Sequence, residues 1–341
     1  MNRKPITSLC AALLALAPHL PAAAQQDERL FRVELMIFTH ETVKRTAAES
    51  WEATPRLAYP NAARFLVNES RVATLQQEFD GESELDAFGR QLITLPPDAR
   101  EPPTPVPAAT PHPDTDLADP PEEPLYQPFV TLERERRELS PGAARMNRSG
   151  RYQLLFHESW IQPVSDRGSA LPIVIDRSGD TGEWPLLQGS ILLYLSRYLH
   201  LETDLWLNTD GSYLPGTWWL PPPPLAPPSV LVDGLPLPAA REAAAQAEAG
   251  VIESAQTVAR TDDFFSLASP AGAAPDEEAA PPPPPWPWRH AVRMQQKRRM
   301  RSQEVHYLDH PLLGVVIVVT PFDPEARAAE LEAARRAGAA E

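Results

Sequence analysis

Five consecutive aliphatic β-branched residues, positions 315–319, constrain the fold more than any other stretch of the sequence. Gly314 precedes this run and Thr320-Pro321 follows it, which gives it the length of a strand. Because aliphatic side chains occupy both faces, we expect a central strand that is buried on both sides. Residues 304–309 alternate apolar and polar side chains, and His310-Pro311 breaks the chain after them. The sequence therefore predicts a hairpin of one amphipathic and one central strand, preceded by a basic strand over residues 293–301.

Other stretches have the period of two that is typical of strands. These are residues 30–39, residues 151–162, and a hairpin over residues 188–207 that turns at Ser196-Arg197. In the second strand of this hairpin the leucines are expected to face the core. The side chains expected to face outward are Tyr198, His200, Glu202, Asp204 and Trp206. Trp51 and Tyr59 lie in a polar setting, and we expect both to fold back on the sheet.

Helical spacing of apolar residues predicts one packed helix over residues 126–146 and a short helix over residues 82–91. The last residues, 323–341, are rich in alanine, glutamate and arginine and predict a loosely held tail helix. The expected fold class is α+β, with a mostly antiparallel sheet and one packed helix.

Two segments crowded with proline interrupt this pattern. The chain has 41 prolines among 341 residues, and they cluster within residues 96–124 and 221–285. Both segments hold too few large apolar residues to offset the entropy of ordering, so we interpret the first as a linker and the second as an insertion, both proline-rich. The core domain is then expected in three parts, residues 25–95, 125–220 and 286–322.

The first 24 residues have the pattern of a secretory signal peptide. Arg3 and Lys4 precede an apolar run, and Ala22 and Ala24 form an A-x-A cleavage site. A membrane anchor is the alternative, but the run is short and broken by proline. We expect a periplasmic protein with no membrane span after cleavage. The single cysteine, Cys10, would leave with the signal.

The formal net charge of −15 argues against nucleic acid or anionic lipid as a partner. An anionic ligand would have to meet a local basic cluster, and the sequence has one. It consists of Arg289, Arg293, Lys297, Arg298, Arg299 and Arg301.

Enzymatic interpretations have weaker support. His306 and His310 would lie about 13 Å apart on a strand, so we predict no metal site. The pairs Glu202 with Asp204 and Glu304 with Asp309 keep a glycan hydrolase open as an alternative. The motifs of nucleophilic catalysis and of phosphate binding are absent, and we predict neither catalytic residues nor a cofactor.

Four blocks of the sequence together carry a family resemblance. The blocks are FRVELMIF, YQLLFHESWIQP, GSILLYLSRYLHLETDLWL and RRMRSQEVHYLDHPLLGVVIVVTP. They resemble the CsiV family of bacterial periplasmic proteins assigned to peptidoglycan binding. The resemblance implies peptidoglycan as the ligand, and a cell-wall synthase or its lipoprotein activator as a protein partner. It covers neither proline-rich segment.

The basic strand and its neighbours are the predicted ligand-binding surface. The planar guanidinium of arginine suits the carboxylates of muramic acid and of peptide stems, and aromatic rings can lie against sugars. The predicted ligand-binding residues are Arg299, Arg301, Glu304, His306, Tyr307, Asp309, His200, Trp206 and Trp160.

An equally weighted alternative is that Arg298, Arg299 and Arg301 pair with acidic residues across the strands, namely with Glu202, Asp204 and Asp309. With the resemblance, the sequence predicts a non-catalytic peptidoglycan-binding protein that modulates cell-wall synthesis. A peptidoglycan hydrolase and a protein scaffold without glycan binding are the alternatives.

Overall fold

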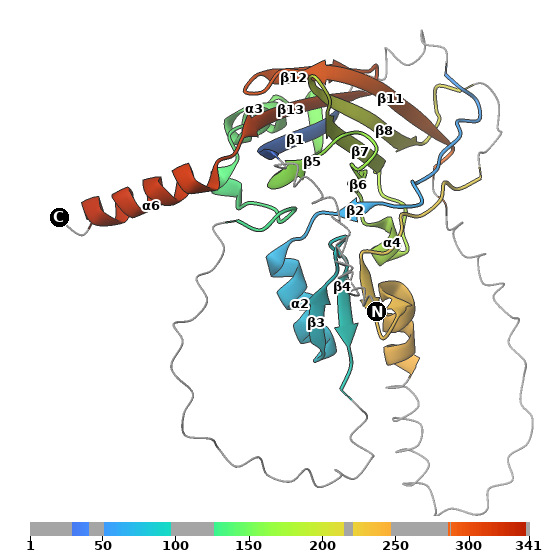
Figure 1. The fold of residues 1–341 in the computed structure, drawn as a ribbon. Helices are drawn as coiled ribbons and strands as arrows, with labels where there is room; N and C mark the ends of the chain where they lie inside the picture. The colour runs from blue at the N-terminus through green and yellow to red at the C-terminus, as the bar shows by residue number, and fades with distance from the viewer. Residues whose placement is uncertain are drawn as a thin grey trace, which may run out of the picture.

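The computed structural model describes residues 29–40, 51–96, 126–214, 221–246, 286 and 288–338 (Figure 1). The predicted signal peptide with Cys10 lies outside these residues, as does most of each proline-rich segment. Within the described ranges, no helix has the length and apolar character needed to span a membrane.

The first sheet is antiparallel and has the strand order β12-β13-β1-β5. Its strands are β1 (Arg29–His40), β5 (Tyr152–Val164), β12 (Val305–Asp309) and β13 (Leu313–Pro321). The predicted central strand is confirmed, because β13 pairs with β1 on one side and with β12 on the other. Strands β1 and β5 are antiparallel neighbours.

The second sheet has the order β11-β8-β7-β6-β2 and is antiparallel except between β2 and β6. Its strands are β2 (Arg64–Phe65), β6 (Ile173–Val174), β7 (Leu187–Leu195), β8 (Leu199–Thr209) and β11 (His290–Met300). The hairpin between β7 and β8 and the basic strand β11 are both confirmed.

One apolar core holds the first two sheets together in the upper part of the molecule (Figure 1). Leu35 and Ile37 of β1 are fully buried in this core, and so are Leu201 and Leu205 of β8. Each such side chain contributes about 1.5–3 kcal/mol through removal from water. Trp51 and Tyr213 pack against the edge of this core, with ring centroids 5.6 Å apart.

A small lobe below the two sheets has its own sheet, of order β10-β9-β4-β3. Its elements are α2 (Glu69–Phe79), β3 (Glu82–Leu85), β4 (Gln91–Thr94), β9 (Val230–Val232), β10 (Leu235–Pro236) and a helix over residues 237–246. Strand β4 pairs in parallel with β9, so the sheets of the molecule are mostly but not wholly antiparallel.

The prediction that residues 221–285 contribute nothing to a core is wrong for residues 221–246. Val230, Val232 and Leu237 are buried against Leu75 and Ile93 in the core of the small lobe. The aliphatic run is short and lies among prolines, but pairing with β4 gives it a partner that the local sequence does not reveal.

Two predicted helices also need correction. Residues 82–91 form β3, a turn and the start of β4, because the Asp86 side chain accepts hydrogen bonds from the amides of Phe88 and Arg90. Residues 126–139 are mostly extended, with a single turn of 3-10 helix, η1 (Arg134–Arg136). The packed helix α3 is Ser140–Ser149, which has proline in its first turn and Gly150 as its C-cap.

The tail helix is confirmed as α6 (Pro324–Gly338).

Candidate functional site

The outer face of the second sheet gathers charged and aromatic side chains from three adjacent strands. Register places Tyr194 of β7 beside His200 of β8, and His200 beside Arg299 of β11. One step along, Glu202 lies beside Lys297. We call this surface the open face, and define it by Ser190, Leu192, Tyr194, His200, Glu202, Asp204, Arg293, Gln295, Lys297 and Arg299.

A groove of about 540 Å³ crosses the open face. It is lined by Glu202 and Lys297 from the sheet, and by residues 58–60, Arg167 and Pro172 from segments outside the strands. The side chains of Arg167 and Lys297 remain more than half exposed, at 62% and 56%. A ligand in the groove could therefore reach both cations without any movement of the backbone.

Glu202 is the most heavily bonded carboxylate of the open face. Arg167 donates two hydrogen bonds to it, of 3.1 and 2.9 Å, and the Tyr194 hydroxyl donates a third of 3.1 Å. The Nζ of Lys297 lies 3.1 Å from the same carboxylate. These contacts, that of Arg167 above all, lower the pKa of Glu202 to about 2. Glu202 is therefore an anion at neutral pH and serves as an acceptor.

Asp204 is held in a similar way by Arg293, whose Nε and Nη2 each donate a hydrogen bond of 2.7 Å to it. Such a two-point pairing fixes the guanidinium plane. The cations Arg167, Arg293, Lys297 and Arg299 outnumber the carboxylates Glu202 and Asp204 on and beside the open face. Local charge is thus opposite in sign to the net charge of −15.

At one end of the open face, His200 stacks on Tyr194 with ring centroids 5.0 Å apart. Burial lowers the pKa of His200, and the neighbouring cations Lys297 and Arg299 act in the same direction. The imidazole is therefore neutral at neutral pH. The exposed guanidinium of Arg299 lies 4.8 Å from the ring centre of Tyr198, which leaves its hydrogen-bond donors available to a ligand.

Two predicted aromatic ligands are wrong. Trp206 shares the outward side of β8, but it is fully buried under Tyr59, with ring centroids 5.0 Å apart. Trp160 is also fully buried, and its Nε1 donates a 2.7 Å hydrogen bond to Gln162. Neither indole can stack on a sugar ring, because the outward side of a strand is exposed only where nothing covers it.

The remaining predicted residues lie in three places: the open face, the turn after β11, and strand β12. His200 and Arg299 belong to the open face. Strand β11 ends at Met300, so Arg301 lies in the turn that follows, where its exposed side chain pairs with Glu304 at 3.6 Å. Arg301 and Arg299 therefore do not share a strand face. The His306 ring bonds the backbone of the same turn.

Strand β12 carries Tyr307 and Asp309 at the edge of the first sheet. The Tyr307 hydroxyl donates a 2.6 Å hydrogen bond to Asp309, and its ring stacks on Phe38. Gln296 of β11 donates a 2.8 Å hydrogen bond to the backbone oxygen of Asp309, which joins the edges of the two sheets. Across the described ranges, no group of three or more histidine, cysteine or acidic residues could hold a metal ion.

The alternative of cross-strand pairing is right about two acids and wrong about their partners. Glu202 and Asp204 pair with Arg167, Lys297 and Arg293. Within the part of the chain that the structure describes, neither Arg298 nor Arg299 forms an ion pair. Sequence reasoning missed Arg167, which lies in a loop without periodicity, whereas the alternation of β7 could have placed Tyr194 beside His200.

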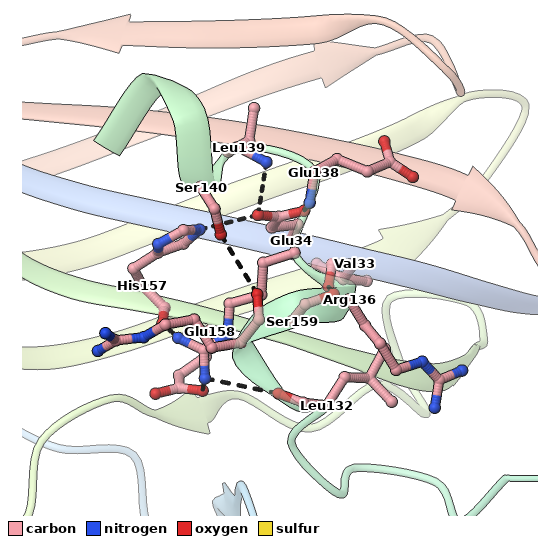
Figure 2. Close-up of polar contacts among 12 residues, drawn as sticks. Val33, Glu34, Leu132, Arg136, Glu138, Leu139, Ser140, His157, Glu158 and Ser159 are labelled. Carbon is pink, nitrogen blue, oxygen red and sulfur yellow. Dashed lines mark hydrogen bonds and ion pairs between the residues drawn. The ribbon is translucent and has the colours of Figure 1, made fainter. Parts of the chain in front are cut away.

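The outer face of the first sheet has a different organisation, because residues 132–149 cover it (Figure 2). We call it the closed face, and define it by Arg32, Glu34, His157 and Ser159. The Glu34 side chain is 3% exposed and accepts hydrogen bonds from the amides of Glu138 and Leu139 and from His157, all within 2.9 Å.

Opposing effects act on Glu34. Burial favours its neutral form, but the hydrogen bonds from His157 and the two amides outweigh burial and lower the pKa of Glu34. Arg137, from the covering segment, donates a hydrogen bond to the backbone oxygen of His157 and pairs at 2.5 Å with Glu158, which lies on the other side of β5. The polar groups of the closed face are thus used within the protein, whereas the open face keeps cations that reach solvent.

Comparison with known proteins gives one match. A family model described as "Peptidoglycan-binding protein, CsiV" matches residues 7–322. No curated protein and no solved structure matches the chain.

Proposed function

Since the chain belongs to the CsiV family of peptidoglycan-binding proteins, we propose that its open face binds peptidoglycan. One observation carries this proposal: a groove of about 540 Å³ with solvent-exposed cations lies on a protein whose net charge is −15. A groove lined by both Arg167 and Lys297 suits a polymer that presents carboxylates at intervals. Glu202 and Asp204 supply acceptors for sugar hydroxyl groups.

The proposed binding is non-catalytic. A glycosidase that uses two carboxylates needs one of them protonated near neutral pH, which requires a raised pKa. The pKa of Glu202 is lowered instead, to about 2, and Arg293 holds both oxygens of Asp204. These two carboxylates therefore favour binding over hydrolysis. Release of dye from labelled sacculi by the purified protein would contradict this part of the proposal.

We further propose that the mature protein is periplasmic and modulates cell-wall synthesis by contact with a synthase or its lipoprotein activator. The support is the signal-like pattern of residues 1–24 and the edge strand β12. Val305 and Tyr307 on β12 are 64% and 44% exposed, and an exposed edge strand is a common surface for protein contacts.

A sacculus pulldown tests the proposed ligand. The variant Lys297→Ala with Arg299→Ala should reduce retention by about tenfold, since two charge-assisted contacts are lost. The matched control is Arg145→Ala with Arg148→Ala, which removes two exposed arginines from α3 on the other sheet. Equal retention of both variants would reject the open face as the binding surface. A native protein that fails to bind sacculi would favour the scaffold alternative.

A further inference from the structure

A second cleft, of about 320 Å³, lies at the junction of the two-sheet core and the small lobe. It is bounded by residues from β5, from the segment between β6 and α4 (Ser178–Thr181), and from the approach to α2. These elements meet in the middle of Figure 1. Its walls combine apolar side chains, among them Leu155, Phe156, Ile175 and Leu186, with a similar share of polar surface. The volume is that of a site for a small ligand.

Arg177 brings a positive charge to this cleft, and the acids near it are already engaged. Asp180 pairs with Arg71 at 2.9 Å, and Asp176 accepts hydrogen bonds from Tyr59, Ser178 and Gly189. Among the described residues, no carboxylate lies within ion-pair distance of Arg177.

The Arg177 guanidinium is poorly compensated. Although its side chain reaches solvent, the surrounding protein removes much of its hydration and lowers the pKa of Arg177, and the nearby charge of Arg71 adds to this effect. The charges of Asp180 and Glu158 act in the opposite direction but do not outweigh it. A bound anion would offset both costs.

Glu158 supplies the opposite charge, and among the residues that the structure describes only one of its two carboxylate oxygens has a hydrogen-bond partner. Its Oε2 pairs with Arg137, whereas its Oε1 has no hydrogen-bond donor in the described part of the chain. Burial raises the pKa of Glu158 even though Arg137 lies against it and the charge of Arg177 acts in the opposite direction. A second cation beside Oε1 would therefore be stabilising.

We propose that this cleft binds short apolar peptides with free termini, the carboxylate on Arg177 and the ammonium on Glu158. The apolar residues of the lining receive the side chains, and the Thr131 hydroxyl, which accepts a 3.5 Å hydrogen bond from Asn68, can donate to the peptide carbonyl. A zwitterionic ligand also keeps the cleft near electrical balance, which a simple anion would not. This site does not rest on the function proposed for the open face, because the two grooves share no lining residue.

Calorimetric titration with three probes tests the proposal on the native protein. The probes are alanyl-leucine, its N-acetyl derivative, which lacks the ammonium, and its C-terminal amide, which lacks the carboxylate. Alanyl-leucine should bind at least about tenfold more tightly than either derivative, since each derivative loses one charge-assisted contact.

Two variants then assign each end of the peptide. Arg177→Gln should bind alanyl-leucine and its amide equally, and Glu158→Gln should bind alanyl-leucine and its N-acetyl derivative equally. The open-face variant Lys297→Ala with Arg299→Ala should bind all three probes as the native protein does. The proposal is overturned if the native protein does not bind alanyl-leucine, or if it binds the three probes alike. Because these outcomes come from native protein, they hold even if a variant fails to fold.

Discussion

The closed face and the open face place the same kinds of side chain on the outsides of two sheets and use them differently. On the closed face, Glu34 and His157 form a buried pair beneath residues 132–149. On the open face, Glu202 and His200 lie beside exposed cations, with only flanking segments along the groove. The two faces carry similar residue types, so the difference comes from the covering segment, residues 132–149. A covered polar face stabilises the fold, whereas an uncovered one is available to bind a ligand.

The largest expected effect is on the closed face. Glu34→Ala leaves the amides of Glu138 and Leu139 and the His157 ring without an acceptor, so unfolding should become easier by about 3–5 kcal/mol. Chemical denaturation measures this change. Glu202→Ala is the matched variant on the open face. A loss for Glu202→Ala as large as that for Glu34→Ala would remove the distinction between the faces.

The second largest expected effect is on how stability changes at acidic pH, which should differ between the two faces. The pKa of Glu34 is lowered in the folded state from 4.5, so the stability that it contributes is complete above pH 4.5. That stability is lost as the pH falls through the folded pKa, because protonation weakens the bonds from the two amides and His157. Glu34→Gln should flatten the decline in melting temperature below pH 4.5. A decline as steep as that of the native protein would show that another group is responsible.

Glu202 should give a weaker acid dependence of the same sign. Its pKa falls from 4.5 to about 2 on folding, so its contribution is present above pH 4.5 and disappears as the pH falls toward 2. Solvent screens its partners Arg167 and Lys297, and we expect Glu202→Gln to cost at most about 1 kcal/mol at neutral pH. Denaturant titrations at pH 7 and pH 3 measure both values. A cost of several kcal/mol would mean that the open face is structural.

The smallest effect on stability is expected for Lys297→Ala with Arg299→Ala, since both side chains are exposed and surface substitutions change stability little. Its loss of sacculus retention should shrink as ionic strength rises, because salt screens the contacts that the variant lacks. A parallel loss of melting temperature and retention would assign these residues to the fold.

The strands could be read from the sequence, because burial on one or both faces imposes a period of two or an aliphatic run. The hairpin around Ser196-Arg197 and the central strand β13 follow from this pattern alone. The closed face could not be predicted. Residues 126–139 have helical spacing, but their backbone bonds go to β5 and to Val67, and Pro141 places the helix start later in the chain.

The candidate site was predicted in part for a related reason. Alternation places His200, Glu202 and Trp206 on one side of β8, and the structure agrees. It does not indicate that Tyr59 covers Trp206, because that contact joins residues far apart in sequence. Arg167 reaches Glu202 from a loop, where no periodicity indicates the direction of a side chain. The open face therefore differs from the predicted binding surface at residues that make contacts with segments far away in the sequence.

Hydrogen exchange with soluble peptidoglycan fragments tests the distinction most directly. If the open face binds the polymer, amides in the loop of residues 166–170 and in the turn of residues 196–198 should exchange more slowly in the complex. Amides of residues 132–139, over the closed face, should exchange at the same rate with and without fragments. Slower exchange at residues 132–139, with no change at residues 166–170 and 196–198, would contradict the account.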